Sequence, residues 1–490
     1  MRKIKLEREP NYKPLHNAFP YQQEAYEAIK DLPYAAVFHE QGLGKTKIAI
    51  DLLLYWLSSK DIDTVLIVTK KQLVLNWQEE FRTHTHINPK TLTNNKGSNF
   101  YVFNGPSRVV ITNFEVVTIE KERFKLYLKS RNVAIIIDES AKLKNPSSKL
   151  ANDFFELSEL FKIKVIMTGT PVANRPFDIW AQVFFLDGGS SLGKDFKRFK
   201  ESMDLSNDLV TDRLKRKEFE KAISGIFNRI KLFSVRETKD SGVVVLPNRE
   251  YIDLWTSFTP DQLKMYNKVK KDLLLEIQNG DETILDDSTG SLKRLLRLVQ
   301  ITSSPKLVDN TSRIKSAKER ELDELVESIV NKGEKCIVWT SFIDNVDYFT
   351  EKYKPYNAVK IHGRLSIEKR NAALKRFKAG DSKMLIATPQ SAKEGLTLTV
   401  ANHVIFYDRG FSLDDYLQAQ DRIHRISQEK TCYVYNIMTK GSIDEWIDLL
   451  LKAKKNAASL VQGDVSIDDY KERIDYSYGT MVRLILGIDE

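Results

Sequence analysis

The sequence has only two cysteines among its 490 residues, and no long apolar run interrupts it. Cys336 and Cys432 lie far apart inside strand-like segments, so they cannot form a zinc cluster, and a structural disulfide is not expected. A reducing, cytoplasmic compartment is the expectation. Apolar runs such as 65–68 and 134–137 are far too short to span a bilayer. Residues 1–9 alternate in charge and lack the apolar core of a secretory signal, so no membrane partner is expected.

Neither sign of charge dominates. Lys and Arg number 76 against 67 Asp and Glu, a formal net charge of +9, which leans only mildly toward a polyanionic partner. The hydrophobic share of 42% and the charged share of 29% are those of a globular protein and exclude extended disorder. The length suggests about three domains of ordinary size.

Short β-branched segments alternate with amphipathic segments in both halves of the chain. Buried strands that alternate with helices are typical of parallel sheets covered on both faces, so we expect two α/β domains. The expected strands are 35–39, 64–69, 108–112, 133–138 and 164–168 in the first half, and 335–340, 358–361, 383–388, 401–407 and 431–437 in the second.

Between these halves the pattern changes to charged helical stretches around a short extended piece, 242–254, and a polar loop, 279–290. We therefore divide the chain into four parts. They are a first domain with a helical insertion from about residue 187, a linker with a further insertion, a second domain and a C-terminal extension, at 1–235, 236–315, 316–455 and 456–490.

The first expected strand runs into His-Glu-Gln-Gly-Leu-Gly-Lys-Thr at 39–46, and a helical pattern follows directly. Such a turn lets backbone N–H groups and a helix N-terminus surround phosphates. Lys45 is expected to reach the β- and γ-phosphates of ATP, and Thr46 to ligate Mg²⁺. His39 stands where the general pattern has its first glycine, and a plain strand-to-helix turn is the alternative at this point. The residues expected to hold the nucleotide here are Gly42, Leu43, Gly44, Lys45 and Thr46.

Two carboxylates, Asp138 and Glu139, end the apolar run 133–137. Carboxylates at the end of a buried strand are costly unless they serve a cation or a reaction. Asp138 fits a Mg²⁺ ligand, and Glu139 fits the base that orients the attacking water. An Asp-Glu pair after a strand is by itself more often the start of a loop or helix, but the upstream phosphate loop favours the functional interpretation.

These segments and others, in the same order, resemble the motifs of the Swi/Snf-type (Snf-two family) DNA translocases of helicase superfamily two. The resemblance covers about residues 20–446. Its most specific piece is Gln-Ala-Gln-Asp-Arg-Ile-His-Arg-Ile-Ser-Gln at 418–428, and Lys-Leu-Lys-Asn at 142–145 is characteristic of this family. The other matching segments are 19–22, 42–46, 76–77, 111–115, 138–141, 168–171, Leu295 and Arg297 with Pro305, 337–342, 361–363 and 393–398.

The resemblance implies a fold of two RecA-like parallel-sheet domains in tandem, with helical insertions. It also implies that Gln22 contacts the adenine and that Gly395 belongs to a glycine turn facing the γ-phosphate. Gln418 is then a polar contact near that phosphate. Arg422 and Arg425 are then arginine fingers, which reach the nucleotide only when the two domains close, so that hydrolysis depends on closure.

By the same resemblance, phosphates of one DNA strand contact Thr112, Thr340, Ser341 and Thr388, which position the protein without reading bases. The expected function is DNA-stimulated ATP hydrolysis coupled to movement on duplex DNA, with remodelling of branched DNA, by a monomer that uses ATP and Mg²⁺. The alternatives are a strand-separating helicase of the same superfamily and a clamp that binds ATP and DNA without turnover.

Three residues depart from the family pattern. Ala141 stands where relatives often have a histidine that links the nucleotide site to 168–170, so weaker coupling of hydrolysis to DNA is expected. Lys70 replaces a proline that usually follows the second strand, and Ser427 replaces a glycine; we expect both to be tolerated.

Overall fold

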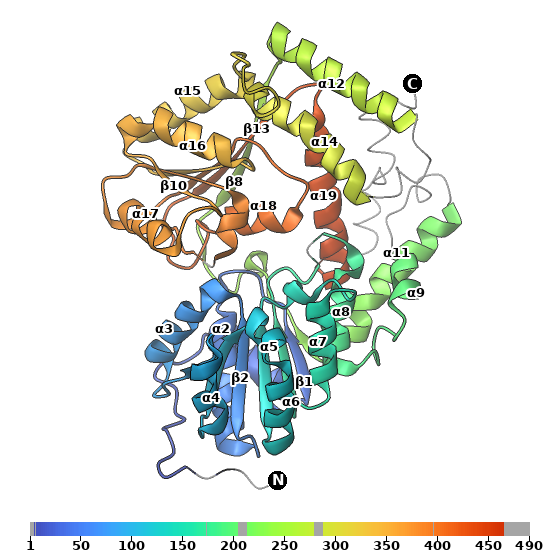
Figure 1. The fold of residues 1–490 in the computed structure, drawn as a ribbon, viewed down its shortest axis with the longest axis vertical. Coiled ribbons are helices and arrows are strands. Elements are labelled where there is room, and N and C mark those ends of the chain that lie inside the picture. The colour runs from blue at the N-terminus through green and yellow to red at the C-terminus, as the bar shows by residue number, and fades with distance from the viewer. Residues whose placement is uncertain are drawn as a thin grey trace. The chain divides into compact units, whose positions relative to one another are not determined.

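A computed structural model describes residues 4, 6–172, 174–203, 213–278, 288–394 and 396–464. These residues divide into two compact units, each built on one sheet (Figure 1). The first unit contains the described residues of Met1–Asp204, Glu218–Val244 and Ala457–Ile467, and the second contains those of Leu205–Lys217 and Val245–Asn456. The domain limits expected from the sequence stay a prediction.

The first unit has a seven-stranded parallel sheet in the order β3-β4-β2-β5-β6-β1-β7. Its five longer strands confirm those predicted, to within one or two residues at each end. The two-residue strands β3 and β7 were not predicted, because two residues carry no periodicity. The strands are β1 (Tyr34–Val37), β2 (Thr64–Thr69), β3 (Lys90–Thr91), β4 (Val109–Asn113), β5 (Val133–Asp138), β6 (Ile163–Met167) and β7 (Ser234–Val235).

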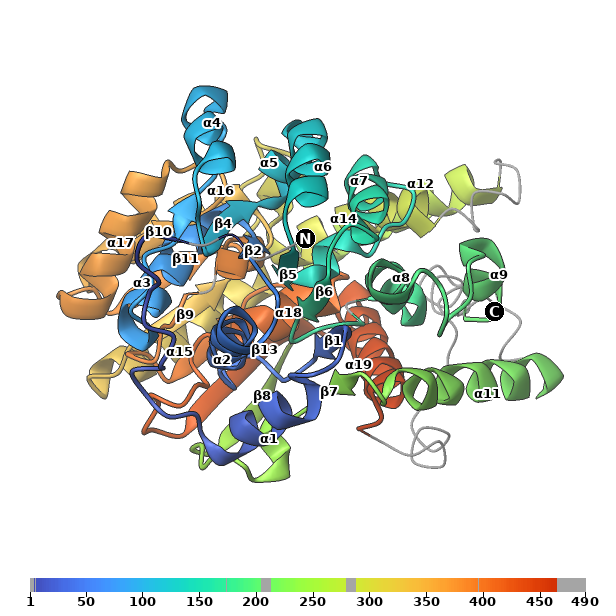
Figure 2. The same cartoon turned by 90° about the horizontal axis from the view of Figure 1, so that it is seen from below.

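Helices cover both faces of this sheet (Figure 2). Alternate strand residues form one core with α1, α2 and α3, while α5, α6 and α7 lie on the opposite side. Helix α2 buries Trp56 and most of its apolar side chains in that core, which fixes the position of its N-terminus. The helices are α1 (Pro20–Ile29), α2 (Lys45–Ser59), α3 (Val74–His84), α4 (Lys96–Asn104), α5 (Phe114–Ile119), α6 (Lys121–Ser130), α7 (Lys149–Ser158), α8 (Trp180–Asp187), α9 (Phe196–Glu201) and α11 (Arg213–Ile230).

The second unit has a six-stranded parallel sheet in the order β10-β11-β9-β12-β13-β8. Strand residues of one parity pack against α15 and α16, and those of the other parity against α17 and α18. The five predicted strands are confirmed. The strands are β8 (Arg249–Thr256), β9 (Cys336–Trp339), β10 (Val359–Ile361), β11 (Met384–Ala387), β12 (His403–Phe406) and β13 (Cys432–Thr439). The helices are α12 (Pro260–Gln278), α14 (Ser288–Ser303), α15 (Ala317–Asn331), α16 (Ile343–Lys352), α17 (Ile367–Ala379), α18 (Leu413–Gln420) and α19 (Ile443–Gln462).

The extended piece expected within 242–254 is strand β8, and it is a full member of the second sheet. It pairs in parallel with β13 over eight residues, from Arg249 opposite Cys432 to Thr256 opposite Thr439. Its polar alternation suits an edge position, which a sequence pattern does not distinguish from a linker. Of the polar loop expected at 279–290, residues 279–287 lie outside the described residues, and α14 begins at Ser288.

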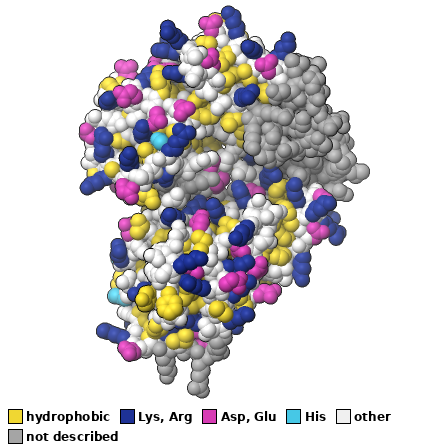
Figure 3. All heavy atoms as spheres, viewed as in Figure 1, with side chains coloured by type: hydrophobic (Ala, Val, Ile, Leu, Met, Phe, Trp, Pro, Cys, Tyr) yellow, Lys and Arg dark blue, Asp and Glu magenta, His cyan; other side chains and the backbone are white. Residues whose placement is uncertain are grey.

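No helix in the described ranges combines the length and the apolar character that crossing a bilayer requires. On the face of the molecule shown in Figure 3, Lys and Arg side chains are interspersed with Asp and Glu within each unit. This mixture agrees with the mild formal charge and gives no single-sign patch on that face.

A buried ion pair leads to a prediction about stability. Inside the second unit, Lys318 of α15 has no exposed surface, and its Nζ lies 2.7 Å from Oδ2 of Asp444 in α19. Lys318→Met leaves the buried Asp444 carboxylate without its countercharge. We expect the free energy of unfolding in denaturant to fall by about 3–5 kcal/mol.

The matched control is the double variant Lys318→Met/Asp444→Asn. It removes the uncompensated charge and keeps one side-chain oxygen, which can still accept from Thr439 N, while the new amide N–H group can donate to Thr302 Oγ1. It should recover most of the loss. A single variant as stable as the unaltered chain would show that the pair contributes nothing.

Candidate functional site

The predicted phosphate loop connects β1 to α2 in the first unit. Gly42 and Gly44 have φ values of 88° and 69°, in the left-handed region that glycine adopts without strain. Helix α2 begins directly at Lys45, so its N-terminal N–H groups face this loop. The Lys45 ammonium donates to the carbonyls of His39 and Glu40, at 2.8 and 3.0 Å. The loop therefore has the shape and charge of an anion site.

Gln22, in the first turn of α1, is buried against the same loop. Its Nε2 lies 3.4 Å from the Leu43 carbonyl, to which Tyr21 Oη also donates at 3.2 Å. A Cβ atom at Gly44 would come within 2.2 Å of Gln22 Nε2. Glycine is thus favoured at position 44 by the left-handed backbone, and a larger residue there would also have to displace the end of the Gln22 side chain.

The Asp138 carboxylate is buried at the end of β5. Its Oδ2 accepts hydrogen bonds from Trp77 Nε1 at 2.9 Å and Thr69 Oγ1 at 3.1 Å. Burial raises the pKa of Asp138, and the charge of Glu139 raises it further, whereas Trp77, Lys45 and Thr69 act in the opposite direction. A divalent cation would offset the electrostatic cost of burying this carboxylate. Carboxylate and hydroxyl oxygens are the ligands that Mg²⁺ takes. The carboxylate of Asp138 and the hydroxyl of Thr46 are therefore chemically suited to hold Mg²⁺.

Glu139 has a left-handed backbone, with φ 60° and ψ 47°, which costs a non-glycine residue about 1–2 kcal/mol. Its Oε2 lies 3.2 Å from the Nζ of Lys70, and each side chain is 18% exposed. Lys70 follows Thr69, so consecutive residues at the end of β2 hold the two carboxylates of the acidic pair. In the sequence, Lys70 is recognisable only as a departure from the family pattern. In the structure, its ammonium pairs with the Glu139 carboxylate.

Segment 168–171 packs against the phosphate loop. A Cβ atom at Gly169 would lie 2.7 Å from Gln41 Cγ and 3.4 Å from Lys45 Nζ. The predicted segments of the first unit therefore meet at the carboxyl ends of its strands, as parallel sheets require.

In the second unit, Asp408 holds the end of β9. Its Oδ2 accepts from Thr340 Oγ1 at 2.6 Å and from Ser303 Oγ at 2.7 Å, and its Oδ1 accepts from Ser341 N at 2.7 Å. The Thr340 side chain is fully buried. The sequence alone does not identify Asp408, because a lone Asp after a strand has no distinctive spacing.

Thr112 and Thr388 are also buried. The Thr112 hydroxyl lies 3.4 Å from the Leu92 carbonyl. The Thr388 backbone N–H donates to Ile361 O at 3.2 Å, and its carbonyl accepts from Ser391 Oγ at 2.6 Å. The contacts of these threonines with DNA stay a prediction.

The amphipathic sequence pattern that begins at Leu413 continues to His424, but α18 ends at Gln420, so the helix is shorter than this pattern indicates. The carbonyl of Arg422 accepts from Leu398 N at 2.9 Å, a tertiary hydrogen bond in place of a helical one. Gln418 lies inside α18, where its Nε2 donates to Asp414 Oδ1 at 2.6 Å.

Arg422 and Arg425 therefore lie in the turns after α18, beside segment 396–398. Arg422 Nη1 lies 3.4 Å from the Leu396 carbonyl, and Arg425 Nη1 donates to Thr397 Oγ1 at 2.7 Å. Gly395, the predicted γ-phosphate contact, lies outside the described residues.

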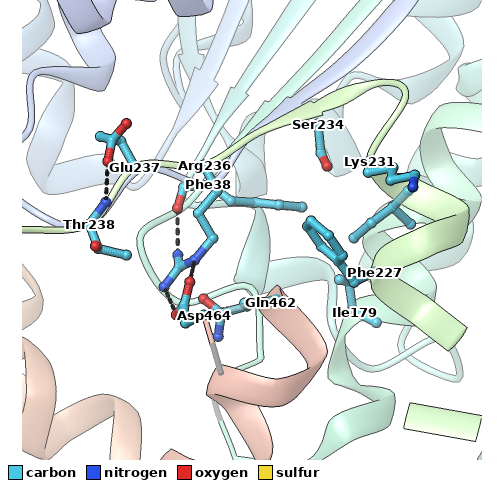
Figure 4. A pocket seen from close by; sticks show the side chains of 12 residues that line it. Phe38, Ile179, Phe227, Lys231, Ser234, Arg236, Glu237, Thr238, Gln462 and Asp464 are labelled. Carbon is cyan, nitrogen blue, oxygen red and sulfur yellow. Dashed lines mark hydrogen bonds and ion pairs between the residues drawn. The ribbon is translucent and has the colours of Figure 1, made fainter. Parts of the chain in front are cut away.

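A pocket of about 390 Å³ lies in the first unit next to the strand that leads into the phosphate loop (Figure 4). Arg236 Nη1 donates to the Phe38 carbonyl at 2.7 Å, and the same guanidinium forms a two-pronged ion pair with Asp464. The C-terminal end of the described chain is thus bound close to the start of the loop. The pocket contains none of the predicted site residues.

Residues 35–307 match the SNF2-related domain, and residues 317–427 match the helicase conserved C-terminal domain. The chain belongs to the SNF2-related family. The resemblance read from the motifs is confirmed, and the first match includes the phosphate loop and the acidic pair.

Similar members of the SNF2-related family include an uncharacterized ATP-dependent helicase of Mycoplasma genitalium, which is 27% identical to this chain. The match covers 88% of this chain and 41% of the length of that helicase. An ISWI chromatin-remodeling complex ATPase of Saccharomyces cerevisiae is 26% identical, in a match that covers 83% of this chain and 37% of the length of that ATPase. The chain thus spans less than half the length of these curated relatives. The solved structure of the Sulfolobus solfataricus SWI2/SNF2 ATPase core in complex with dsDNA is 23% identical to this chain, with a TM-score of 0.43. The match covers 96% of this chain and 100% of the Sulfolobus chain.

Proposed function

We propose that the chain is a DNA-stimulated ATPase that moves along duplex DNA. The observation that supports this most strongly is the first-unit site. There a glycine loop, the Lys45 ammonium and the acidic pair Asp138 and Glu139 meet at one end of a parallel sheet. Membership of the SNF2-related family supports the coupling to DNA.

The loop from Gly42 to Thr46 and the N-terminus of α2 bind the phosphates, and Gln22 contacts the adenine. Thr46 and Asp138 would hold Mg²⁺, which when bound neutralises phosphate charge. Lys45 exchanges the carbonyls of His39 and Glu40 for phosphate oxygens, because an ionised partner makes the stronger hydrogen bond.

Glu139 orients the attacking water and accepts its proton. Lys70 occupies one oxygen of the carboxylate, which fixes the direction in which the other oxygen points. A base held in one orientation needs no reorganisation when the water arrives.

For the second unit we retain the roles that the family resemblance implies. Arg422 and Arg425 stabilise the charge that develops on the transferred phosphoryl group, and Gln418 and Gly395 line the same site. Thr112 of the first unit and Thr340, Ser341 and Thr388 of the second contact phosphates of the DNA.

Arg425→Ala should lower kcat by about 10²-fold, because a donor to a developing negative charge is removed. The affinity for ADP, measured with a fluorescent analogue, should change little. Arg320→Ala is the matched control, since that guanidinium is 88% exposed on α15 of the same unit. Equal losses in turnover and affinity would show that Arg425 does not act mainly in the transition state.

The experiment that tests the proposed function measures phosphate release with single-stranded, duplex, forked and four-way DNA, together with displacement of a third strand from a triplex. We expect stimulation by duplex DNA, third-strand displacement, and DNA affinity that falls steeply with salt and varies little with sequence. Stronger stimulation by single strands with efficient fork unwinding would favour the strand-separating helicase. If no DNA supports ATP turnover, the remaining alternative is a clamp that binds ATP and DNA without hydrolysis.

A further inference from the structure

A fully buried glutamine in α8 connects two segments of the proposed nucleotide site. Gln182 has no exposed surface. Its Oε1 accepts from Ser140 Oγ at 2.8 Å, and its Nε2 donates to the Pro171 carbonyl at 2.7 Å and to the Asp178 carbonyl at 3.0 Å. The two carbonyls can only accept, so they fix which end of the amide faces Ser140.

Each bridged segment continues directly into the site. Ser140 is the residue after Glu139, and its side chain is also fully buried. Pro171 ends segment 168–171, in which Gly169 packs against Lys45 and Gln41 of the phosphate loop. The amide of Gln182 therefore spans from the acidic pair to the segment that contacts the loop.

The bridge formed by Gln182 differs from apolar packing because its hydrogen bonds are directional. An apolar side chain of the same size would fill the space, yet it would let the two segments slide past each other. A buried amide whose donors and acceptor are all engaged resists such displacement, because any shift leaves a buried polar group unpaired. Ala141 has no polar side-chain atom, so the connection in this chain is made one residue earlier.

We propose that Gln182 is a positioning residue that couples segment 168–171 to Glu139 through the Ser140 hydroxyl, and that it supplies the link that Ala141 cannot. The inference rests on the proposed function, since its main consequence is read in ATP turnover. The hydrogen bonds of Gln182 go to Ser140, Pro171 and Asp178, so we expect its replacement to leave nucleotide binding nearly unchanged.

The experiment compares Gln182→Leu, Ser140→Ala and the double variant with the unaltered chain. Each single variant should lower DNA-stimulated kcat by about tenfold, as expected when a reacting group is misplaced. KM and the affinity for fluorescent ADP should stay within about twofold, because uniform binding is untouched. The double variant should be no slower than Gln182→Leu alone, since both changes break the same connection.

Ser158→Ala is the matched control. Ser158 is a buried serine whose Oγ donates to the Phe185 carbonyl of α8 at 2.6 Å, away from the site. It should lower the melting temperature about as much as Ser140→Ala while leaving kcat unchanged.

Turnover in Ser140→Ala equal to that of Ser158→Ala would overturn the inference, as would fully additive losses in the double variant. If Gln182→Leu does not fold, Ser140→Ala, which removes one hydroxyl, still decides the question. An unaltered chain without ATPase activity would instead refute the proposed function, and this inference with it.

Discussion

Lys45→Ala should abolish measurable ATP hydrolysis while leaving DNA binding nearly intact. The ammonium bridges two loop carbonyls, and in the proposed nucleotide complex it reaches the β- and γ-phosphates. Loss of one donor to a developing negative charge costs about 10²–10³ in kcat, and loss of its full charge brings the decrease to at least about 10³-fold.

The measurement is steady-state phosphate release with saturating duplex DNA, paired with DNA binding by fluorescence anisotropy. Lys60→Ala serves as the control, because that lysine lies at the far end of α2 and pairs with Asp31 on the surface. Turnover at the unaltered rate in Lys45→Ala would overturn the assignment of the phosphate loop.

Glu139→Gln should lower turnover by about 10² to 10⁴ while nucleotide affinity persists. The amide has nearly the shape of the carboxylate and keeps one oxygen for Lys70, but it cannot accept the proton of the attacking water. The removal of a negative charge beside Asp138 also reduces the repulsion between the two groups, so binding of Mg²⁺ and ATP should not weaken.

Single-turnover kinetics separate these effects. A slow chemical step with an unchanged Kd for ATP is the expected pattern, and Glu156→Gln, a half-exposed carboxylate on α7, should behave as the unaltered chain. If Glu139→Gln instead weakens ATP binding as strongly as it slows turnover, the residue acts in binding and not as the base.

Much of the fold follows from local pattern. The ten predicted strands are present because each is a short, nearly continuous apolar run, which is what a strand covered by helices on both faces requires. The phosphate loop and the acidic pair were found in the same way, since glycines before a helix and carboxylates after a buried strand are informative without any knowledge of contacts.

What the sequence pattern missed depends on partners distant in the chain. Strand β8 was expected as an extended piece, but its place in the second sheet depends on its pairing with β13, about 180 residues away. Helix α18 ends at Gln420, and the carbonyl of Arg422 accepts a hydrogen bond from Leu398 N; the local sequence at 421–424 predicts neither feature.

By itself the sequence determined the two sheets, the order of the motifs and the residues of the proposed nucleotide site, because strand periodicity and loop composition are properties of neighbouring residues. Only the tertiary structure decided that Lys70 holds Glu139, that Asp408 fixes Thr340, and that Gln182 joins Ser140 to Pro171. Each of these contacts brings together side chains from separate elements, and hydrogen bonding between such groups is set by packing in three dimensions.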